Sequence, residues 1–298
     1  MSDLNVTIQQ HWVNSFSDTV FELAQQTKAR LRELCEFEPI VGANRFLDRV
    51  GSVDVQDINT RSPEIVPSDL QWDRRLATPN RVGVAFFVDR RDIERVLTDP
   101  KSTYAKRAAQ ALERDFDRTC ISSLAATVFT GQNGTTPVTA ATDGVATVDG
   151  TPGFTYDLML QVDQNFQAYE IGTEVGLRKF LLISEQEHAQ LMKEGELINK
   201  DFTDRAVVDS GKIKQVMDFD VVQFGSKMPI PMLPVTGSVR QCFAAVSGQM
   251  KVVMPSTWDI EWQPRNDRWK TDQLLASGER GFVRMQGQGI QIINATAT

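Results

Sequence analysis

The segment from Thr103 to Phe129 constrains the fold most, because it contains neither glycine nor proline. Thr103 is suited to cap the start of a helix, and a helix over this segment would be about 40 Å long at about 1.5 Å per residue. A rod of that length spans a small domain. After Arg118 the apolar residues surround the predicted helix on all sides, so we expect its last turns, up to Phe129, to be buried.

Apolar and charged side chains occupy opposite faces of this predicted helix. The apolar face is formed by Ala105, Ala109, Leu112, Phe116 and Cys120. The opposite face carries Arg107, Arg114 and Arg118. Three acids, Glu113, Asp115 and Asp117, alternate with two of these arginines, which favours a solvated or inter-subunit charge network over a metal site.

Composition excludes several classes of protein. Of the 298 residues 41% are hydrophobic, enough for a sizeable core in one large domain or two smaller ones. The 32 lysines and arginines against 39 aspartates and glutamates leave a net charge of −7, which disfavours tight nucleic-acid binding by a broad basic surface.

Cysteines and histidines show no metal-binding or disulfide pattern. Cys35, Cys120 and Cys242 are widely spaced, and His11 and His188 lie far from them in the sequence. The N-terminus has no basic region followed by an apolar run, and no segment has enough consecutive apolar residues to span a bilayer. We therefore expect no metal, no cofactor and no membrane partner, and synthesis in a cytoplasm.

The N-terminal third combines a helix, two strands and a long connection. Helical spacing predicts a helix over Asn14–Leu34, with Lys28, Arg30 and Arg32 in its last turns. Strand patterns over Arg49–Ile58 and Arg81–Val88 predict a long hairpin. The connection between them carries Trp72, Arg74 and Arg75, and it either reaches toward a neighbouring molecule or is a mobile surface loop.

The remaining chain mixes helices and strands, so the fold class is α+β. Turn signals fill 130–153, a helix is predicted over Tyr156–Tyr169, and a buried strand over Lys179–Ile183 precedes a helix begun by Ser184 and Glu187. Further strands are predicted around Phe219–Val222, Cys242–Val246, Val252–Met254 and Trp258–Trp262, and over Gly281–Ile293 as one long element.

No motif for catalysis emerges. Gly287 and Gly289 lack the third glycine and the following helix of a dinucleotide site, so we interpret them as a bulge or close packing. His188 has no accompanying G-x-S-x-G segment, and we interpret it as exposed or locally bonded. Trp258 and Trp262 suit a core or an interface equally, whereas Trp72 is the better interface candidate.

The order of these elements resembles the major capsid proteins of tailed double-stranded DNA phages, which have the Hong Kong 97-type fold. The segments that carry the resemblance are "GANRFLDRVG", "DIERVLTDPKSTYAKRAAQALERDFDRTCISSLAATVFTG", "KIKQVMDFDVVQFGSKMP" and "SGERGFVRMQGQGIQIINA". The resemblance implies an N-arm over 1–41, an E-loop over 42–84, a P-domain with its spine helix over 85–130, an A-domain over 131–252, and P-domain return strands over 253–298.

The resemblance implies a structural protein and not an enzyme. Such a protein self-assembles into hexamers and pentamers of an icosahedral head that encloses the double-stranded DNA genome without sequence-specific binding. Residues 42–81 contain no lysine, so isopeptide cross-linking is not expected there. About 85 residues precede the P-domain, which implies a separate scaffolding protein. A portal protein and a decoration or cement protein are further expected partners, with assembly in the bacterial host cytoplasm and a final place in the virion.

The candidate assembly residues follow from exposure and charge. They are Trp72, Arg74, Arg75, Arg107, Arg114, Arg118, Lys28, Arg30 and Arg32. We expect Trp72 and the first forty residues to find cover only on other copies of the chain. Two alternatives stay open: an encapsulin-like shell that encloses protein cargo, and a monomeric α/β hydrolase or binding domain.

Overall fold

The computed structural model describes residues 26–40, 42–53, 55, 57, 59, 61, 67–89, 100–151, 153–172, 176–193, 208–209, 212–228, 230–255, 258–265, 267–269 and 271–297. These residues form two compact units. The first takes described residues from 26–30, 80–118 and 254–280, and the second takes them from 31–79, 119–253 and 281–297. The predicted helix before residue 26 lies outside the described residues.

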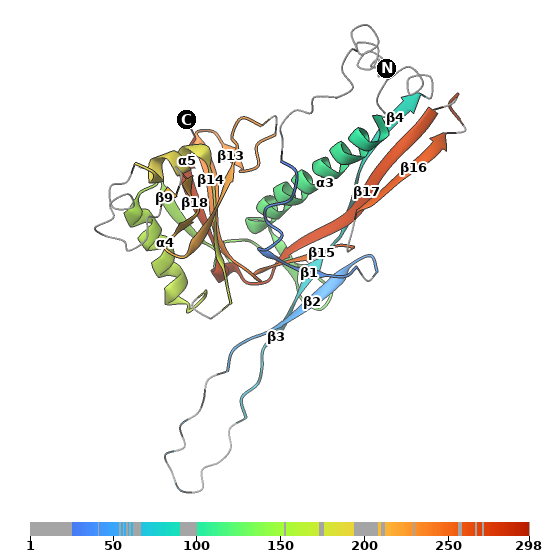
Figure 1. Cartoon of the computed structure of the whole chain (residues 1–298). Coiled ribbons are helices and arrows are strands. Elements are labelled where there is room, and N and C mark those ends of the chain that lie inside the picture. Colours follow the sequence, from blue (N-terminus) through green and yellow to red (C-terminus); the bar gives the residue numbers. More distant parts are fainter. Residues whose placement is uncertain are drawn as a thin grey trace. The chain divides into compact units, whose positions relative to one another are not determined.

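The first unit consists of a long helix packed on an antiparallel sheet (Figure 1). Its elements are α3 (Pro100–Leu124), β4 (Asn80–Asp89), β16 (Asp259–Arg265) and β17 (Thr271–Arg284). Strand β17 pairs with β4 on one side and with β16 on the other. Ala108 and Leu112 of α3 are buried against Leu274 and Ala276 of β17, with Trp258 beside them.

The predicted helix is confirmed, but both of its predicted ends are wrong, because α3 begins at Pro100 and not after a cap at Thr103. α3 ends at Leu124, and Val128–Thr130 form strand β5. β5 pairs with β3, so that Leu76 lies opposite Phe129. Sheet pairing with a distant strand therefore satisfies backbone groups that a longer helix would have bonded locally.

A mixed seven-stranded sheet forms the largest part of the second unit. Its strands are β11 (Gln215–Val216), β12 (Phe219–Phe224), β8 (Lys179–Ser184), β14 (Val239–Val246), β18 (Ile290–Thr296) and β7 (Ala146–Gly150), in that order, with β13 (Val235–Thr236) on β14. Helix α4 (Tyr156–Ala168) packs on this sheet. The ring of its Phe166 lies 6.0 Å from the ring of Phe219 on β12. Helix α5 (Glu185–Leu191) follows β8 through the predicted capping box of Ser184 and Glu187, which is confirmed.

Smaller sheets complete the second unit. β2 (Arg45–Val50), β3 (Trp72–Ala77), β5 and β6 (Thr136–Val138) form a four-stranded sheet in that order. β1 (Cys35–Glu38) runs parallel to β15 (Met250–Val253), which pairs with the end of β17. β9 (Val208–Asp209) and β10 (Lys212–Ile213) form a hairpin, and the 3-10 turn η1 (Gly287–Gly289) leads into β18.

Three further expectations about strands and helices are wrong. β2 pairs with β3 and not with Arg81–Val88, which lies in β4 and pairs with β17. Residues 26–34 are bends and turns, so the predicted N-terminal helix does not extend to Leu34. The single element predicted over Gly281–Ile293 is two strands in different sheets, β17 and β18, separated by η1.

Candidate assembly surface

Among the described residues, the four-stranded sheet β2-β3-β5-β6 has one face whose apolar side chains stay partly exposed. Val50 lies opposite Trp72, and Phe46 lies opposite Leu76, which in turn lies opposite Phe129. Residues directly opposite each other share a face of a sheet, as do alternate residues along a strand. The exposed fractions are 70% for Trp72, 47% for Val50, 45% for Phe129 and 38% for Phe46. We call this the Trp72 face.

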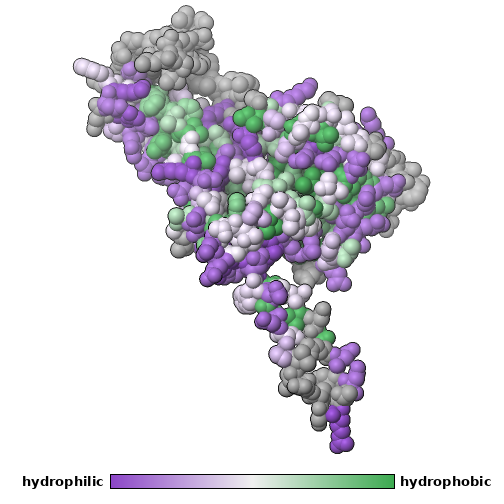
Figure 2. Space-filling model, turned by 180° about the vertical axis from the view of Figure 1, so that it is seen from behind, coloured by the Kyte–Doolittle hydropathy of each residue, from purple (hydrophilic) through white to green (hydrophobic). Residues whose placement is uncertain are grey.

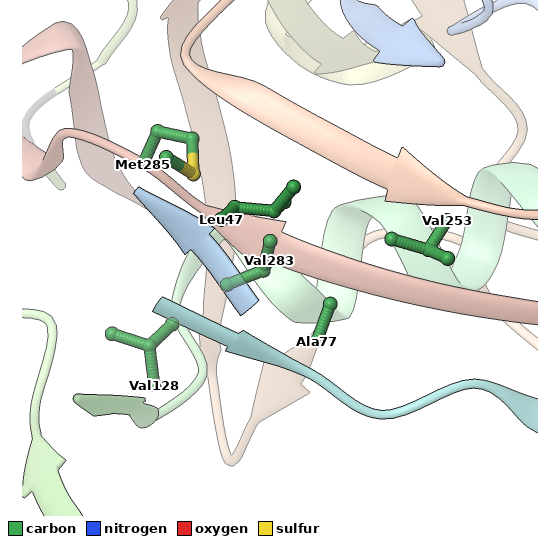
Figure 3. Packing of buried hydrophobic residues seen from close by; sticks show 6 residues of the cluster. All are labelled: Leu47, Ala77, Val128, Val253, Val283 and Met285. Atoms are coloured by element: carbon green, nitrogen blue, oxygen red, sulfur yellow. The ribbon is translucent and has the colours of Figure 1, made fainter. Parts of the chain in front are cut away.

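The opposite face of the same sheet is buried in the core of the second unit. Leu47, Ala77 and Val128 pack against Val253, Val283 and Met285 there (Figure 3). One sheet thus has a covered apolar face and an uncovered one. Exposed apolar residues scattered singly are ordinary on a protein surface, whereas a row of them on one sheet face indicates a contact surface.

A shallow cavity of about 450 Å³ adjoins Trp72 and Arg74. Asp48, Asp73, Gly131 and Gln132 complete its lining. Arg74 Nε lies 3.2 Å from Asp48 Oδ1, and its guanidinium lies 5.6 Å from the centre of the Phe46 ring. The Trp72 face therefore combines apolar side chains with a charged pair at the surface. Figure 2 shows hydrophobic patches separated by hydrophilic residues on the side of the molecule that it displays.

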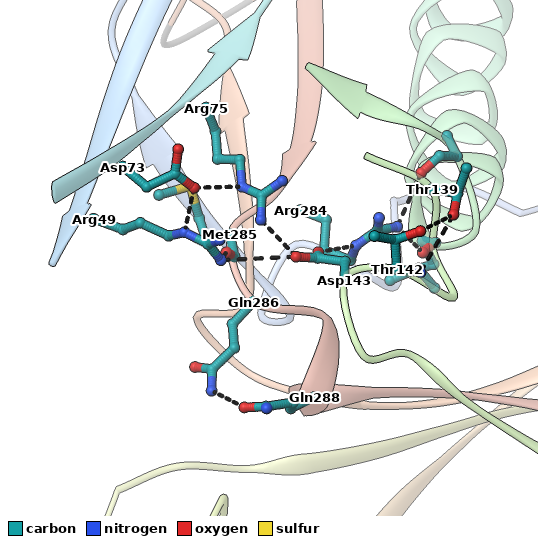
Figure 4. Close-up of polar contacts among 12 residues, drawn as sticks. Arg49, Asp73, Arg75, Thr139, Thr142, Asp143, Arg284, Met285, Gln286 and Gln288 are labelled. Carbon is teal, nitrogen blue, oxygen red and sulfur yellow. Dashed lines mark hydrogen bonds and ion pairs between the residues drawn. The ribbon is translucent and has the colours of Figure 1, made fainter. Parts of the chain in front are cut away.

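Three arginines around one buried carboxylate hold this sheet in place (Figure 4). Asp143 Oδ1 lies 2.5 Å from Arg75 Nη2, and its Oδ2 lies 2.7 Å from Arg284 Nε. Arg49 Nη1 lies 3.7 Å from Asp143 Oδ1, while Arg49 Nε donates to Asp73 over 2.8 Å. We call these five residues the Asp143 cluster. It joins β2, β3 and β17 to the loop between β6 and β7.

Backbone carbonyls extend the Asp143 cluster. Arg49 Nη1 donates to the Met285 carbonyl over 2.8 Å, and Arg284 Nη1 donates to the Leu124 carbonyl at the end of α3 over 2.8 Å. Arg75 and Arg284 are fully buried. Burial lowers the pKa of Arg75, and the negative charge of Asp143 opposes that shift. The cluster therefore has a structural role. It holds β2 and β3 in place, and the Trp72 face is the opposite face of these two strands.

Close backbone approach explains one glycine beside the Asp143 cluster. A Cβ on Gly287 would lie 2.4 Å from the Asp143 carbonyl oxygen, so a larger residue there would displace the loop that carries Asp143. A Cβ on Gly289 would likewise lie 2.5 Å from Gln249 Cγ. The interpretation of these two glycines as close packing is confirmed. The turn at Asp143-Gly144 was predicted, but nothing in the sequence marked Asp143 as the partner of three distant arginines.

Adjacent arginines on β3 have different fates. Arg74 is partly exposed on the Trp72 face, as a candidate assembly residue should be. Arg75 is fully buried and bound to Asp143, so its inclusion among the candidate surface residues is wrong. The reason is the two-residue period of a strand, which sends neighbouring side chains to opposite faces.

The acids of α3 bind their own chain, which corrects the expectation of a solvated or inter-subunit network. Asp117 is fully buried and accepts hydrogen bonds from the Arg30 backbone N–H, at 2.9 and 3.1 Å, and from Gln26 Nε2. Glu113 accepts from the Ala29 backbone N–H over 3.0 Å. Asp115 Oδ2 accepts from Arg280 Nε over 2.7 Å. Residues 26–30 are therefore anchored along α3 within the first unit.

Trp258 also binds an acid of α3. Its Nε1 donates to Glu113 Oε1 over 3.0 Å, and both Trp258 and Trp262 are partly buried against the core of the first unit. Both residues thus pack on the core of the first unit, and a part of each stays exposed. Leu31 and Leu34 are fully buried as well, so the expectation that the first forty residues find cover only on other copies is wrong for 26–34.

The other candidate basic residues are partly or fully exposed. On α3, Arg107, Arg114 and Arg118 are half-buried, and Arg107 Nη1 donates to Gln110 Oε1 over 3.1 Å. Lys28 and Arg30 are exposed, and the guanidinium of Arg32 lies 5.9 Å from the centre of the Phe37 ring. Of these six residues, Arg32 lies in the second unit together with Trp72. The other five lie in the first unit.

Polar groups near α5 have structural roles. The His188 Nε2 accepts a hydrogen bond from the Ile213 backbone N–H over 3.3 Å, which confirms a locally bonded histidine. Buried Arg240 donates to Ser184 Oγ and to Glu187 Oε1, each over 2.7 Å. Within the described ranges no group of three or more histidines, cysteines or acids is placed to hold a metal ion. Nor does any helix in that part of the chain have the length and apolar character needed to cross a membrane.

Comparison with protein families decides what this scaffold is. The family model described as phage capsid protein matches residues 8–296. The chain belongs to the phage capsid protein family. Comparison with curated proteins finds no match. The family excludes the monomeric hydrolase alternative and favours a phage head over an encapsulin-like cargo shell.

Solved phage structures share the fold at low sequence identity. A chain from the capsid of cyanophage P-SCSP1u is 13% identical, with a TM-score of 0.73 and coverage of 97% of this chain and 94% of that one. A chain from the acid-stable capsid of Helicobacter pylori bacteriophage KHP30 is 8% identical, with a TM-score of 0.73 and coverage of 100% and 99%. A chain of Mycobacterium phage Che8 is 16% identical, with a TM-score of 0.68 and coverage of 94% and 96%. The Hong Kong 97-type α+β fold is confirmed, and the chain is a major capsid protein that forms the head.

Proposed function

We propose that copies of this capsid protein join through the Trp72 face when they form the hexamers and pentamers of an icosahedral head. The exposed row of Trp72, Val50, Phe46 and Phe129, on a sheet whose other face contributes Leu47, Ala77 and Val128 to the core, carries this proposal. Burying this row against another copy removes apolar area from water, and tryptophan is enriched among residues that dominate interface energies.

The Asp143 cluster supports this role, because it makes the uncovered face rigid before a contact forms. Binding costs conformational entropy for every side chain and loop that must become ordered. On the opposite face of the sheet, Arg49 of β2 and Arg75 of β3 already pair with Asp143, which also pairs with Arg284. A contact on a preorganised sheet loses less conformational entropy when it forms. Many modest contacts of this kind together stabilise a shell.

Further parts of the family's assembly belong to the same proposal. The chain would be divided into an N-arm, an E-loop, a P-domain and an A-domain. Its partners would be a scaffolding protein, a portal protein and a decoration protein, and the head would assemble in the cytoplasm of the host. The packaged double-stranded DNA would be enclosed without sequence-specific contacts, since a subunit with a net charge of −7 does not hold phosphate tightly over a broad surface.

Surface charge contributes a second, weaker part of the proposal. Lys28 and Arg30 are exposed at the end of the anchored segment, and Arg107, Arg114 and Arg118 are half-buried on α3. We infer that such groups set the register between neighbouring copies, with Arg74 on the Trp72 face. Contacts between exposed charges weaken as salt screens them, so assembly should become less efficient as the ionic strength rises.

The deciding experiment separates folding from assembly. The wild-type chain, Trp72→Ser and Tyr169→Ser are each co-expressed with the neighbouring phage genes, and particles are counted by electron microscopy and sedimentation. Tyr169 is the matched control, because it is an exposed aromatic residue at the end of α4. Urea unfolding of the unassembled subunits measures whether each variant is folded.

Trp72→Ser should keep the unfolding midpoint of the wild type and lose particles, with a critical concentration at least about tenfold higher. Tyr169→Ser should assemble like the wild type. Normal particle yield from Trp72→Ser would overturn the assignment of this face as a contact between copies.

A further inference from the structure

Two cysteines that are far apart in the sequence touch in the second unit. Cys35 begins β1 and Cys120 lies near the C-terminal end of α3, 85 positions later, yet their Sγ atoms are 3.4 Å apart. Both residues are buried thiols. We propose that Cys35 and Cys120 are an oxidation site that closes into an intrachain disulfide.

The geometry favours this bond over other fates of the two thiols. A disulfide joins sulfur atoms about 2.05 Å apart, so the Sγ atoms have to approach by about 1.4 Å. Both side chains are short, and rotation about their χ1 angles moves the Sγ atoms. Cys35 is 7% exposed and Cys120 is fully buried, so Cys35 is the more accessible of the two residues to a small oxidant.

A hydroperoxide is the chemical class of oxidant that fits this burial. The Cys35 thiolate attacks one peroxide oxygen and becomes a sulfenic acid, while the other oxygen leaves as hydroxide or alkoxide. The Cys120 thiolate then attacks the Cys35 sulfur and displaces hydroxide. Overall, two thiols lose two protons and two electrons, and hydrogen peroxide is reduced to two molecules of water.

The third cysteine is a built-in control. Cys242 lies on β14, is fully buried, and has a thiol whose pKa is raised by burial. Its Sγ is not part of the contact between Cys35 and Cys120, so an oxidant at Cys242 finds no second thiol with which to complete a disulfide. Cys242 should therefore form no disulfide in the folded chain under conditions that oxidise the Cys35–Cys120 pair.

The bond would tie β1 and its neighbouring residues to α3 by a covalent link. It would close a loop from residue 35 to residue 120, which restricts the unfolded chain and stabilises the folded one. A reducing cytoplasm would keep the pair open during assembly, and oxidising surroundings would close it in a released particle. This timing rests on the proposed function, whereas the reaction itself takes place within one chain.

The test counts thiols before and after oxidation. Unassembled subunits and assembled particles of the wild type are treated with hydrogen peroxide, denatured and labelled with N-ethylmaleimide, and intact masses are measured. The same is done with Cys120→Ala, which removes the pair, and with Cys242→Ala, which keeps it. Peptide mapping identifies the linked residues, and thermal unfolding compares oxidised with reduced protein.

Oxidation should lower the number of adducts per chain from three to one in the wild type and from two to none in Cys242→Ala. Cys120→Ala should give no linked peptides and should keep the adduct of Cys242, because a sulfenic acid formed at Cys35 has no neighbouring thiol to displace its hydroxide. The oxidised wild type should melt about 5 °C or more above the reduced form, with no gain in Cys120→Ala. Three adducts after oxidation, a disulfide between chains, or a sulfinic acid at Cys35 would overturn the proposal. Unassembled subunits give the same readout, so failure to form particles would not affect it.

Discussion

Arg74 and Arg75 are neighbours on β3 whose guanidinium groups lie on opposite faces of one sheet. Arg74 pairs with Asp48 at the surface, and Arg75 is fully buried against Asp143. One residue is therefore available to another copy of the capsid protein, and the other holds the subunit together.

Replacing each arginine by methionine should separate these two roles. Arg75→Met should lower the free energy of unfolding by about 2 to 3 kcal/mol, because it removes one partner from a buried charge cluster while Arg284 still compensates Asp143. Arg74→Met should change it by less than about 0.5 kcal/mol. Urea unfolding of the unassembled subunit measures both values, and equal losses would contradict the assignment of opposite faces.

Asp143 should be the most sensitive acid in the second unit. Asp143→Ala leaves Arg75 and Arg284 without the carboxylate that both contact, and we expect a loss of about 3 to 5 kcal/mol. Asp149→Ala is the control, since Asp149 is exposed and accepts a hydrogen bond only from nearby Thr151 among the contacts described. Its effect on the free energy of unfolding should be much smaller than that of Asp143→Ala. A stable Asp143→Ala subunit would show that the cluster is not needed for folding.

Gly287 should not tolerate a methyl group. The Cβ of Gly287→Ala would lie 2.4 Å from the Asp143 carbonyl oxygen, so the loop that carries Asp143 must move. We expect a destabilisation of about 1 to 3 kcal/mol, as for other overpacked sites. A Cβ at Gly51 would meet its nearest atoms at 3.6 Å, so Gly51→Ala should be nearly neutral. Thermal unfolding of the two variants compares them directly.

Asp117 should control the order of the segment at 26–30. Asp117→Ala removes the acceptor of the Arg30 backbone N–H, and we expect exchange of that amide hydrogen to become at least about tenfold faster. Asp115→Ala is the control, because Asp115 binds the side chain of Arg280. Mass spectrometry measures the rate of hydrogen exchange at the Arg30 amide. If that amide exchanged as slowly in Asp117→Ala as in the wild type, Asp117 would not anchor the segment.

One surface carboxylate should titrate far below its ordinary range. The hydrogen bond and charge of Arg265 lower the pKa of Asp267 to about 2, from an ordinary value of 3.8. A lowered pKa in the folded state stabilises the fold above the ordinary pKa, and this contribution is lost as the pH falls toward 2. NMR titration should find the low pKa in the wild type and a higher pKa in Arg265→Ala, in which the backbone N–H of Asp267 and the charge of Arg268 still lower it. An unchanged pKa in that variant would exclude Arg265 as its cause.

Patterns within a few residues of one another predicted several of the local elements correctly. The absence of glycine and proline indicated α3, the capping box of Ser184 and Glu187 indicated the start of α5, and the alternation in Arg81–Val88 indicated a strand. Periodicity reports which side of an element is apolar, and the capping signals act within one turn of a helix.

The sequence by itself therefore determined the main helices and many of the strands, the α+β class, and, through the order of these elements, the resemblance to phage capsid proteins. The tertiary structure alone decided that β2 pairs with β3, that Asp143 gathers three arginines, and that Glu113 and Asp117 bind residues 26–30. These contacts join residues from 22 to more than 140 positions apart, and no local pattern records which distant segment will supply a partner. The partner of a buried charge or an open strand edge is chosen by the packing of the whole chain, because every such group must be satisfied at once.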